Sequence, residues 1–388
     1  MRASRRFSSR RPEVGDSYRD SLGLGEIMSI LRIVGAVLGV VVVVFAVLVV
    51  RLFWIAGAFK TLEPHFDGTC ENVPVPPGPE DLVVDRATRN VFLSSTDRRA
   101  MLAGGDARGD IYLLALGDLA TAVPLTQGVP ADFRPHGLSL YVAPDGAKTL
   151  MAINHPKAGG HVVEFYDMAE TPRDDGTVGV ALVHRRSVAG GAMRSPNDVA
   201  ASGPGSFYIT NDHGSTSALG FQLETYLALP RGNVVYFDGA EFSVVAEGFR
   251  YANGIALSPD GGHVYVAETT GHRLSSFARD GATGALDIAG TLDIETGLDN
   301  IDVDENGDLW IGAHPDSIAF LGHAGDAAKL SPSEVLKVKT ENGIPVSAEQ
   351  VYLDAGDEMS GSSVAVVVGG KMLVGDVFEP KILVCDLP

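Results

Sequence analysis

Polar residues of a few types precede short apolar segments at six places along the chain. In chain order these residues are Glu80, His136, Asn197, Asn253, Asp299 with Asn300, and Ser362. Carboxylate and amide oxygens are hard ligands, and Ca²⁺ in proteins takes roughly six to eight of them. Zinc prefers thiolates and imidazoles, which are scarce in this set. If the fold brings these side chains together, they would bind calcium, and His136 would be available as a general base at neutral pH.

Each of these residues opens a repeated pattern that predicts how they are brought together. A short apolar strand, a turn rich in Gly, Asp and Asn, and a second apolar strand follow, and the six copies start at residues 80, 136, 197, 253, 299 and 361. Each unit can hold four short strands, and periods of ~40–50 residues or somewhat more are typical of β-propeller blades. We therefore expect an all-β fold, a six-bladed β-propeller over residues 60–388. Its innermost strands would bring the polar residues to one mouth of the central channel.

Two other interpretations of the pattern remain open. Unrelated β-sandwich hairpins would use the same turns, although their spacing should scatter more than the 46–62 residues seen here. Asn and Asp before a strand also make local turn hydrogen bonds. The protein could then be a non-catalytic binding propeller whose calcium is purely structural.

The overall composition limits the classes of partner. The 388 residues include 46 Gly and 21 Pro, which favours an all-β protein with many turns over a helical bundle. Lys and Arg number 30 against 49 Asp and Glu, so the net charge of −19 predicts no nucleic-acid partner. Two cysteines are too few for a thiolate metal site.

The first 59 residues predict a membrane anchor. Residues 33–50 carry no polar side chain and would span roughly 27 Å as a helix, and the segment before them is rich in arginine. We expect a basic cytoplasmic arm (1–32), a transmembrane helix (33–59) and an extracytoplasmic propeller, periplasmic or extracellular. The alternative is a secreted protein whose signal peptide is cleaved after Ala56-Gly57-Ala58. A start at Met28 instead of Met1 would leave the membrane prediction unchanged.

The two cysteines lie at opposite ends of the predicted propeller, Cys70 before the first copy and Cys385 near the last residue. The two chain ends of a propeller meet in one blade, and an exported domain permits oxidation. These cysteines could therefore be neighbours joined by a disulfide that encloses a very long loop. Two unpaired buried cysteines are the alternative.

At these positions the chain resembles the serum paraoxonase/arylesterase family. The matching strings include PGPEDL, PHGLSL, INHP, PNDVAA, TNDHG, ANGIALSPDGGHVYVAE, LDNIDVDENGDLWIGAHP and the terminal VCDL, in order over essentially residues 66–388. The resemblance implies a six-bladed propeller with two channel Ca²⁺ ions, a closing disulfide, and calcium-dependent hydrolysis of lactones and aryl esters. Organophosphate triesters would be promiscuous substrates.

The resemblance also implies a role for individual residues. The catalytic calcium would be held by Glu80, Asn197, Asn253, Asp299 and Asn300. The structural calcium would be held by Asp81, Asp198 and the backbone carbonyl of Leu138. His136 would be the general base with His155 as its partner, and Cys70 would pair with Cys385. The apolar anchor is longer than in that family, which favours a membrane-tethered form.

Several alternatives concern the chemistry. Asp299 is a rival to His136 as the base, His155 could be purely structural, and His213 and His314 could line the pocket. Residues 214–231 could form an amphipathic lid or an ordinary loop helix. No G-x-S-x-G occurs, so we do not expect a serine hydrolase. A gluconolactonase-type sugar lactonase, usually with one metal, is the second enzymatic possibility; the Glu80-Asp81 and Asn197-Asp198 pairs favour two ions.

Overall fold

The computed structural model describes residues 20–126, 130–172 and 178–388, and these divide between Leu52 and Phe53 into two compact units. The predicted basic arm lies mostly outside the described residues. Helix α1 (Asp20–Ile55) is apolar and is long enough to cross a membrane over Gly25–Ile55, within which an 18-residue window has a mean hydropathy of 3.3. A helix of this kind near the N-terminus fits a signal anchor and a signal peptide equally.

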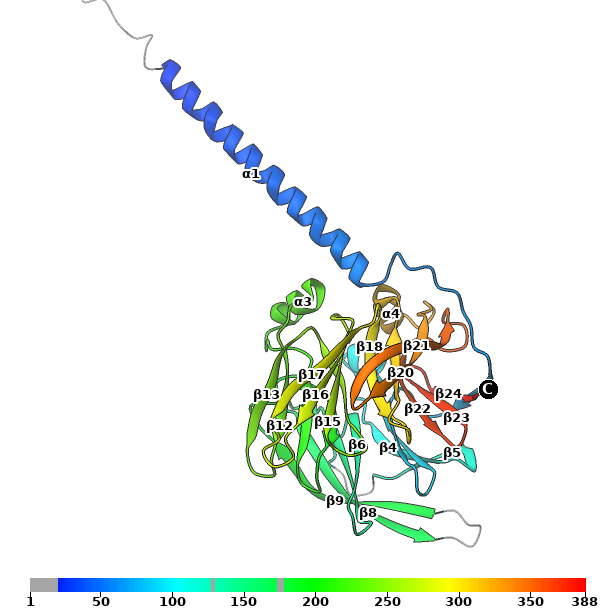
Figure 1. Ribbon diagram of the computed structural model, residues 1–388. Helices are drawn as coiled ribbons and strands as arrows, with labels where there is room; N and C mark the ends of the chain where they lie inside the picture. Colours follow the sequence, from blue (N-terminus) through cyan, green and yellow to red (C-terminus); the bar gives the residue numbers. More distant parts are fainter. Residues whose placement is uncertain (1–19, 127–129, 173–177) are drawn as a thin grey trace, which may run out of the picture. The chain divides into compact units, whose positions relative to one another are not determined.

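The second unit is a six-bladed β-propeller, as the repeats predict (Figure 1). Blade 1 contains β2 (Pro79–Asp85), β3 (Asn90–Ser95), β4 (Asp110–Ala115) and β5 (Asp118–Pro124). Blade 2 contains β6 (Pro135–Val142), β7 (Lys148–Asn154), β8 (Val162–Pro172) and β9 (Val178–Ala189). Blade 3 contains β10 (Pro196–Ala201), β11 (Phe207–Asn211), β12 (Gly232–Phe237) and β13 (Phe242–Phe249).

The remaining three blades complete the ring. Blade 4 contains β14 (Ala252–Leu257), β15 (His263–Glu268), β16 (Arg273–Arg279) and β17 (Leu286–Asp293). Blade 5 contains β18 (Gly297–Val303), β19 (Leu309–His314), β20 (Ser333–Glu341) and β21 (Ile344–Asp354). Blade 6 contains β22 (Ser362–Val368), β23 (Lys371–Asp376), β24 (Lys381–Asp386) and β1 (Thr69–Pro74). Every sheet is antiparallel, and the core lies between neighbouring blades, as where Phe92 and Ile111 of blade 1 pack with Leu150 and Tyr166 of blade 2.

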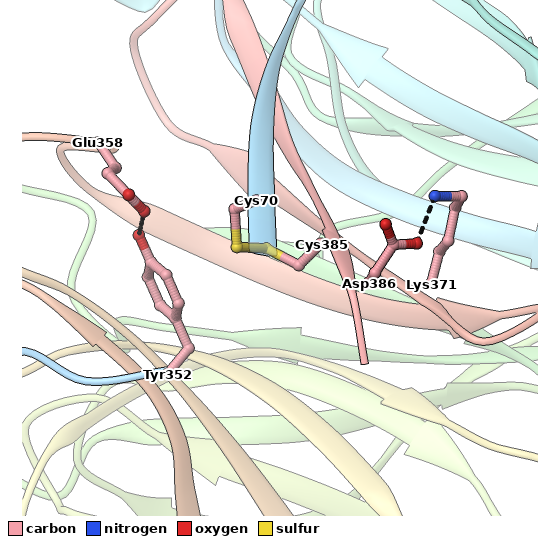
Figure 2. The surroundings of a disulfide bond; sticks show 6 residues. All are labelled: Cys70, Tyr352, Glu358, Lys371, Cys385 and Asp386. Atoms are coloured by element: carbon pink, nitrogen blue, oxygen red, sulfur yellow. Dashed lines mark hydrogen bonds and ion pairs between the residues drawn. A yellow bond between two sulfur atoms is a disulfide. The ribbon is translucent and has the colours of Figure 1, made fainter. Parts of the chain in front are cut away.

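Blade 6 joins the two ends of the propeller. Strand β1 pairs antiparallel with β24, and Cys70 lies opposite Cys385 in that register. The two cysteines form a disulfide across 315 residues of sequence, which confirms the predicted closure (Figure 2). In the chain-entropy model, a cross-link over so long a loop stabilises the fold by roughly 6 kcal/mol through the unfolded state.

A β-bulge near the start of each inner strand explains why the polar residues face the channel. Strands β2, β6, β10, β14, β18 and β22 each shift register against their neighbour within their first few residues. A bulge leaves residues out of the ladder and re-aims their side chains. The residues inside the six bulges are Glu80, His136-Gly137, Asn197-Asp198, Asn253-Gly254, Asp299-Asn300 and Ser363.

Three short helices follow the second strand of alternate blades and therefore lie at the mouth where the inner strands begin. They are α2 (Arg98–Leu102), α3 (Ala218–Leu227) and α4 (Ser317–Gly325), of which α3 and α4 are labelled in Figure 1. Their N-caps are Asp97, Ser217 and Asp316, whose side chains accept backbone N–H groups of the first turn. Helix α3 lies within residues 214–231, for which the sequence allowed either an amphipathic lid or an ordinary loop helix.

Candidate active site

The five side chains predicted to hold the catalytic calcium are all buried at the channel mouth. Contacts link them from blade to blade: the Asn300 Nδ2 donates to Glu80 Oε1 at 3.0 Å, and the Thr210 hydroxyl donates to the Asn253 carbonyl at 2.6 Å. Gly254 lies so close to Asp299 that a Cβ on it would meet the Asp299 carbonyl oxygen. The inner strands therefore bring these predicted ligands into one neighbourhood.

The amide oxygens of this cluster are the most informative atoms. The Oδ1 atoms of Asn197, Asn253 and Asn300 are buried, and none of them has a hydrogen-bond partner within the described part of the chain. Native proteins rarely leave buried polar atoms unpaired, because the loss of hydration costs about 1–3 kcal/mol each. Oxygens left bare on three neighbouring blades match the ligands of a hard divalent cation. These residues fit calcium.

The amides are essential to this fit. Among residues 20–126, 130–172 and 178–388, no group of three or more His, Cys, Asp and Glu side chains is placed to hold a metal. Within the cluster, only Glu80 and Asp299 carry a charge, so a bound cation would depend on the neutral Asn oxygens. A search for charged ligands alone would miss this candidate site.

Glu80 is held as a carboxylate by its neighbours. Burial alone would raise its pKa, but His136 at 3.3 Å and Arg98 at 3.4 Å outweigh burial and lower the pKa to about 2. Asp299 differs, because burial raises its pKa while His314, whose Nε2 lies 2.8 Å from its Oδ2, only partly opposes the shift. One oxygen of Asp299 is thereby engaged by His314.

The residues predicted to hold the structural calcium form a second buried set. Asp81 and Asp198 directly follow Glu80 and Asn197 in the sequence. Asp198 accepts the backbone N–H groups of Val199 at 2.7 Å and Ile255 at 2.8 Å, and Asp81 accepts that of Leu138 at 2.6 Å. Burial raises the pKa of both carboxyls well above the ordinary value, and nearby carboxylates raise it further. A cation would relieve this repulsion.

A cavity of about 210 Å³ lies along the inner strands and is lined by Asp81, Leu138 and Asp198, among others. The contact seen for Leu138 is its N–H group with Asp81; the role of its carbonyl as a ligand stays a prediction.

Three histidines form a connected row beside the ligand cluster. The Nδ1 of His136 lies 2.9 Å from the Nε2 of His155, and the Nδ1 of His155 lies 2.7 Å from the Nδ1 of His161. Burial and the neighbouring His136 and His161 lower the pKa of His155 well below the ordinary value, so this ring is neutral. The pairing of His136 with His155 agrees with the sequence prediction, whereas His161 was missed. Its only sequence signal is its position six residues after His155, across the β7–β8 turn.

His213 and His314, for which the sequence left a pocket-lining role open, are both buried. The His213 ring lies between Asp212 Oδ1 at 2.7 Å and Thr225 Oγ1 at 2.8 Å, and the Phe221 ring packs on it with centroids 4.4 Å apart. The His314 ring packs on Phe320 at 4.0 Å. Both histidines thus combine a polar partner with an aromatic surface.

The sixth polar position differs in detail from the prediction. The Ser362 hydroxyl is engaged by the backbone of blade 5, where it accepts from the Glu334 N–H and contacts the Ala313 carbonyl. It is the next residue, Ser363, whose hydroxyl donates to the Glu80 carbonyl at 2.5 Å. The bulge in β22 moves the site-facing position by one residue, which strand alternation alone does not reveal.

Comparisons with known proteins identify the family of the chain. The model of the Arylesterase family matches residues 101–387. Serum paraoxonase/arylesterase 1 of Homo sapiens is 38% identical over 258 residues, which are 66% of this chain and 69% of the human protein. Serum paraoxonase/arylesterase 2 of Gallus gallus is 35% identical over 287 residues, 73% of this chain and 78% of that protein.

A solved structure of a luciferin-regenerating enzyme shares the fold, with a TM-score of 0.50 at 12% identity over 82% of this chain and 95% of that one. The family match covers well over half of the chain and includes most of the propeller. The chain therefore belongs to the arylesterase family.

Proposed function

We propose that this protein is a calcium-dependent hydrolase of aryl esters and lactones. One observation carries the proposal: three buried amide oxygens that have no hydrogen-bond partner among the residues described lie in the same cluster as the Glu80 carboxylate, which His136 contacts at 3.3 Å. The site then combines a cation-binding set with a candidate base. The names of the relatives, paraoxonase and arylesterase, point to the same class of reaction.

Two sets of residues would hold two ions. Glu80, Asn197, Asn253, Asp299 and Asn300 would hold the catalytic calcium, and Asp81, Asp198 and the Leu138 carbonyl the structural one. When bound, a calcium ion with an open coordination position polarises the substrate carbonyl as a Lewis acid. The presence of two separate carboxylate-containing sets favours this arrangement over a sugar lactonase with a single metal.

The base would be His136. Its Nδ1 is engaged by His155, so its Nε2, on the side of Glu80, is the atom that can accept a proton from the attacking water. His155 would fix the orientation and tautomer of His136. Asp299 is a weaker candidate because His314 already occupies one of its oxygens. A histidine pair beside the ligand cluster also favours catalysis over a binding propeller with a purely structural ion.

The apolar helix α1 supports a location at a membrane. We place the Arg-rich N-terminal side in the cytoplasm and the propeller outside it, as a single-pass anchored protein. The disulfide Cys70–Cys385 agrees with an oxidising compartment. Secretion after cleavage near Ala56 is the alternative.

The purified full-length chain, in detergent with millimolar CaCl₂, is expected to hydrolyse phenyl acetate and δ-valerolactone. Initial rates with phenyl acetate would be followed by phenol release, and those with the lactone by pH-stat titration. A chain that is folded by circular dichroism and loaded with calcium, yet hydrolyses neither substrate, would contradict the proposed function.

A further inference from the structure

The row of three histidines extends beyond what the proposed reaction uses. His136 and His155 account for the base and its partner, whereas His161, just before β8, makes the shortest ring-to-ring contact of the row at 2.7 Å. The two rings stand nearly perpendicular, with centroids 4.8 Å apart and an interplanar angle of 83°. A contact of this length between two ring nitrogens requires a proton between them.

The contacts allow two sets of proton positions that run in opposite directions along the row, and the proposed function selects one of them. In the other set, His136 Nε2 would donate to Glu80 Oε1, 3.3 Å away. For His136 to present a bare Nε2 to the substrate water, its proton must be on Nδ1 and donated to His155 Nε2. His155 then carries its proton on Nδ1 and donates it to Nδ1 of His161. The remaining proton of His161 is on Nε2, which has no partner within the described residues and belongs to a partly exposed side chain. All three rings are then neutral, and their N–H groups all donate in the same direction, from His136 towards His161.

Carboxylates lie at both ends of the row. At the inner end, Glu80 Oε1 lies 3.3 Å from His136 Nε2. At the outer end, burial lowers the pKa of His161, the nearby Asp212 raises it, and His136 lowers it. Asp212 therefore offsets part of the cost of a positive charge on His161.

We propose that His161 is the outer, positioning member of a proton relay that runs from His136 through His155 to the solvent. This inference rests on the proposed function. The attacking water loses a proton to His136 Nε2; the Nδ1 proton of His136 passes to His155 Nε2; the Nδ1 proton of His155 passes to His161 Nδ1; and the Nε2 proton of His161 passes to bulk water.

The relay balances because each ring gains one proton and loses one. The hydroxide electron pair forms the new C–O bond to the acyl carbon, and the electrons of the broken ester bond leave with the alcohol oxygen. The same path in reverse returns a proton to that oxygen and restores the three tautomers.

The test compares His161→Gln, His161→Ala and a control, His65→Gln, in the full-length chain. A glutamine can accept the His155 Nδ1 proton, so it keeps His155 in position, but it cannot pass a proton on. We expect His161→Gln to lower kcat for δ-valerolactone about tenfold with KM unchanged, a part of the roughly 10²–10⁴-fold contribution of general acid–base catalysis. Added imidazole should restore part of the kcat of His161→Ala only. His65 is exposed and bonds to the backbone of Glu63 and Gln350, so His65→Gln should behave like wild type.

A second readout does not depend on turnover. With ¹⁵N-labelled histidine, NMR shifts should show His155 protonated on Nδ1 and bare on Nε2, and this pattern should change in His161→Ala. Full kcat in His161→Gln, no rescue of His161→Ala by imidazole, or the opposite tautomer of His155 would each overturn the relay. A wild-type chain without hydrolase activity would refute the proposed function instead. The His155 tautomer measured by NMR would still show in which direction the hydrogen bonds of the row run.

Discussion

Replacement of His136 by glutamine is expected to lower kcat for phenyl acetate by roughly 10²–10⁴-fold, the range attributed to general acid–base catalysis. The glutamine side chain is similar in length and can still bond to His155, but it cannot take a proton from water at neutral pH. Because His136 is not among the predicted ligands, calcium binding should persist. Steady-state kinetics with saturating calcium, together with the thermal unfolding midpoint, would measure both effects.

His184→Gln is a suitable control for this variant. His184 lies on β9 in the same blade and bonds to Glu164 at 2.8 Å, away from the predicted ligands. It should retain wild-type kcat. If His136→Gln also kept its full kcat, the assignment of the base would be wrong and Asp299 would become the stronger candidate.

Asn253→Ala is expected to have an effect of similar size through the metal. The change removes one of the unpartnered amide oxygens and leaves the backbone bulge of β14 in place. Loss of outer-sphere partners of metal ligands typically lowers metal affinity by about 10–100-fold, and loss of a ligand itself should cost at least as much. We expect a weaker catalytic calcium site, a correspondingly higher calcium requirement for hydrolysis, and an unchanged second site.

The matched control is Asn90→Ala. Asn90 is also buried, but its amide donates to the Val178 carbonyl and it lies at the opposite end of blade 1, where β3 begins. Calcium titrations followed by activity should separate the two variants. Equal calcium requirements for Asn253→Ala and wild type would show that the ligand assignment is incorrect.

The blades were predictable from the sequence because each inner strand combines a polar start, an alternating or continuous apolar run and a tight turn. That pattern depends only on local chemistry, so it survives in all six copies and places residues such as Glu80 and Asn253 correctly at one mouth. The pairing of Cys70 with Cys385 followed from closure of the ring. Proximity of these residues is a property of the topology rather than of any single segment.

Features set by contacts between distant segments were not predictable in the same way. His161 lies in a Gly-rich turn without a recognisable motif, and only the β7–β8 hairpin brings it to His155. Helices α2 and α4 are too short to show a helical period in the sequence. Because of the bulge in β22, Ser363 contacts Glu80 in place of the predicted Ser362. Helix α1 begins at Asp20, before the predicted residue 33, because the more than three turns that precede the continuous apolar run consist of residues compatible with a helix.

The central claim is that oxygen atoms from separate blades hold calcium in the channel. Isothermal titration of CaCl₂ into the chelator-treated, dialysed full-length chain tests it most directly. The account predicts two bound ions per chain, with the affinity of one site lowered in Asn253→Ala and that of the other unchanged. A folded chain that binds no calcium under these conditions would contradict the account.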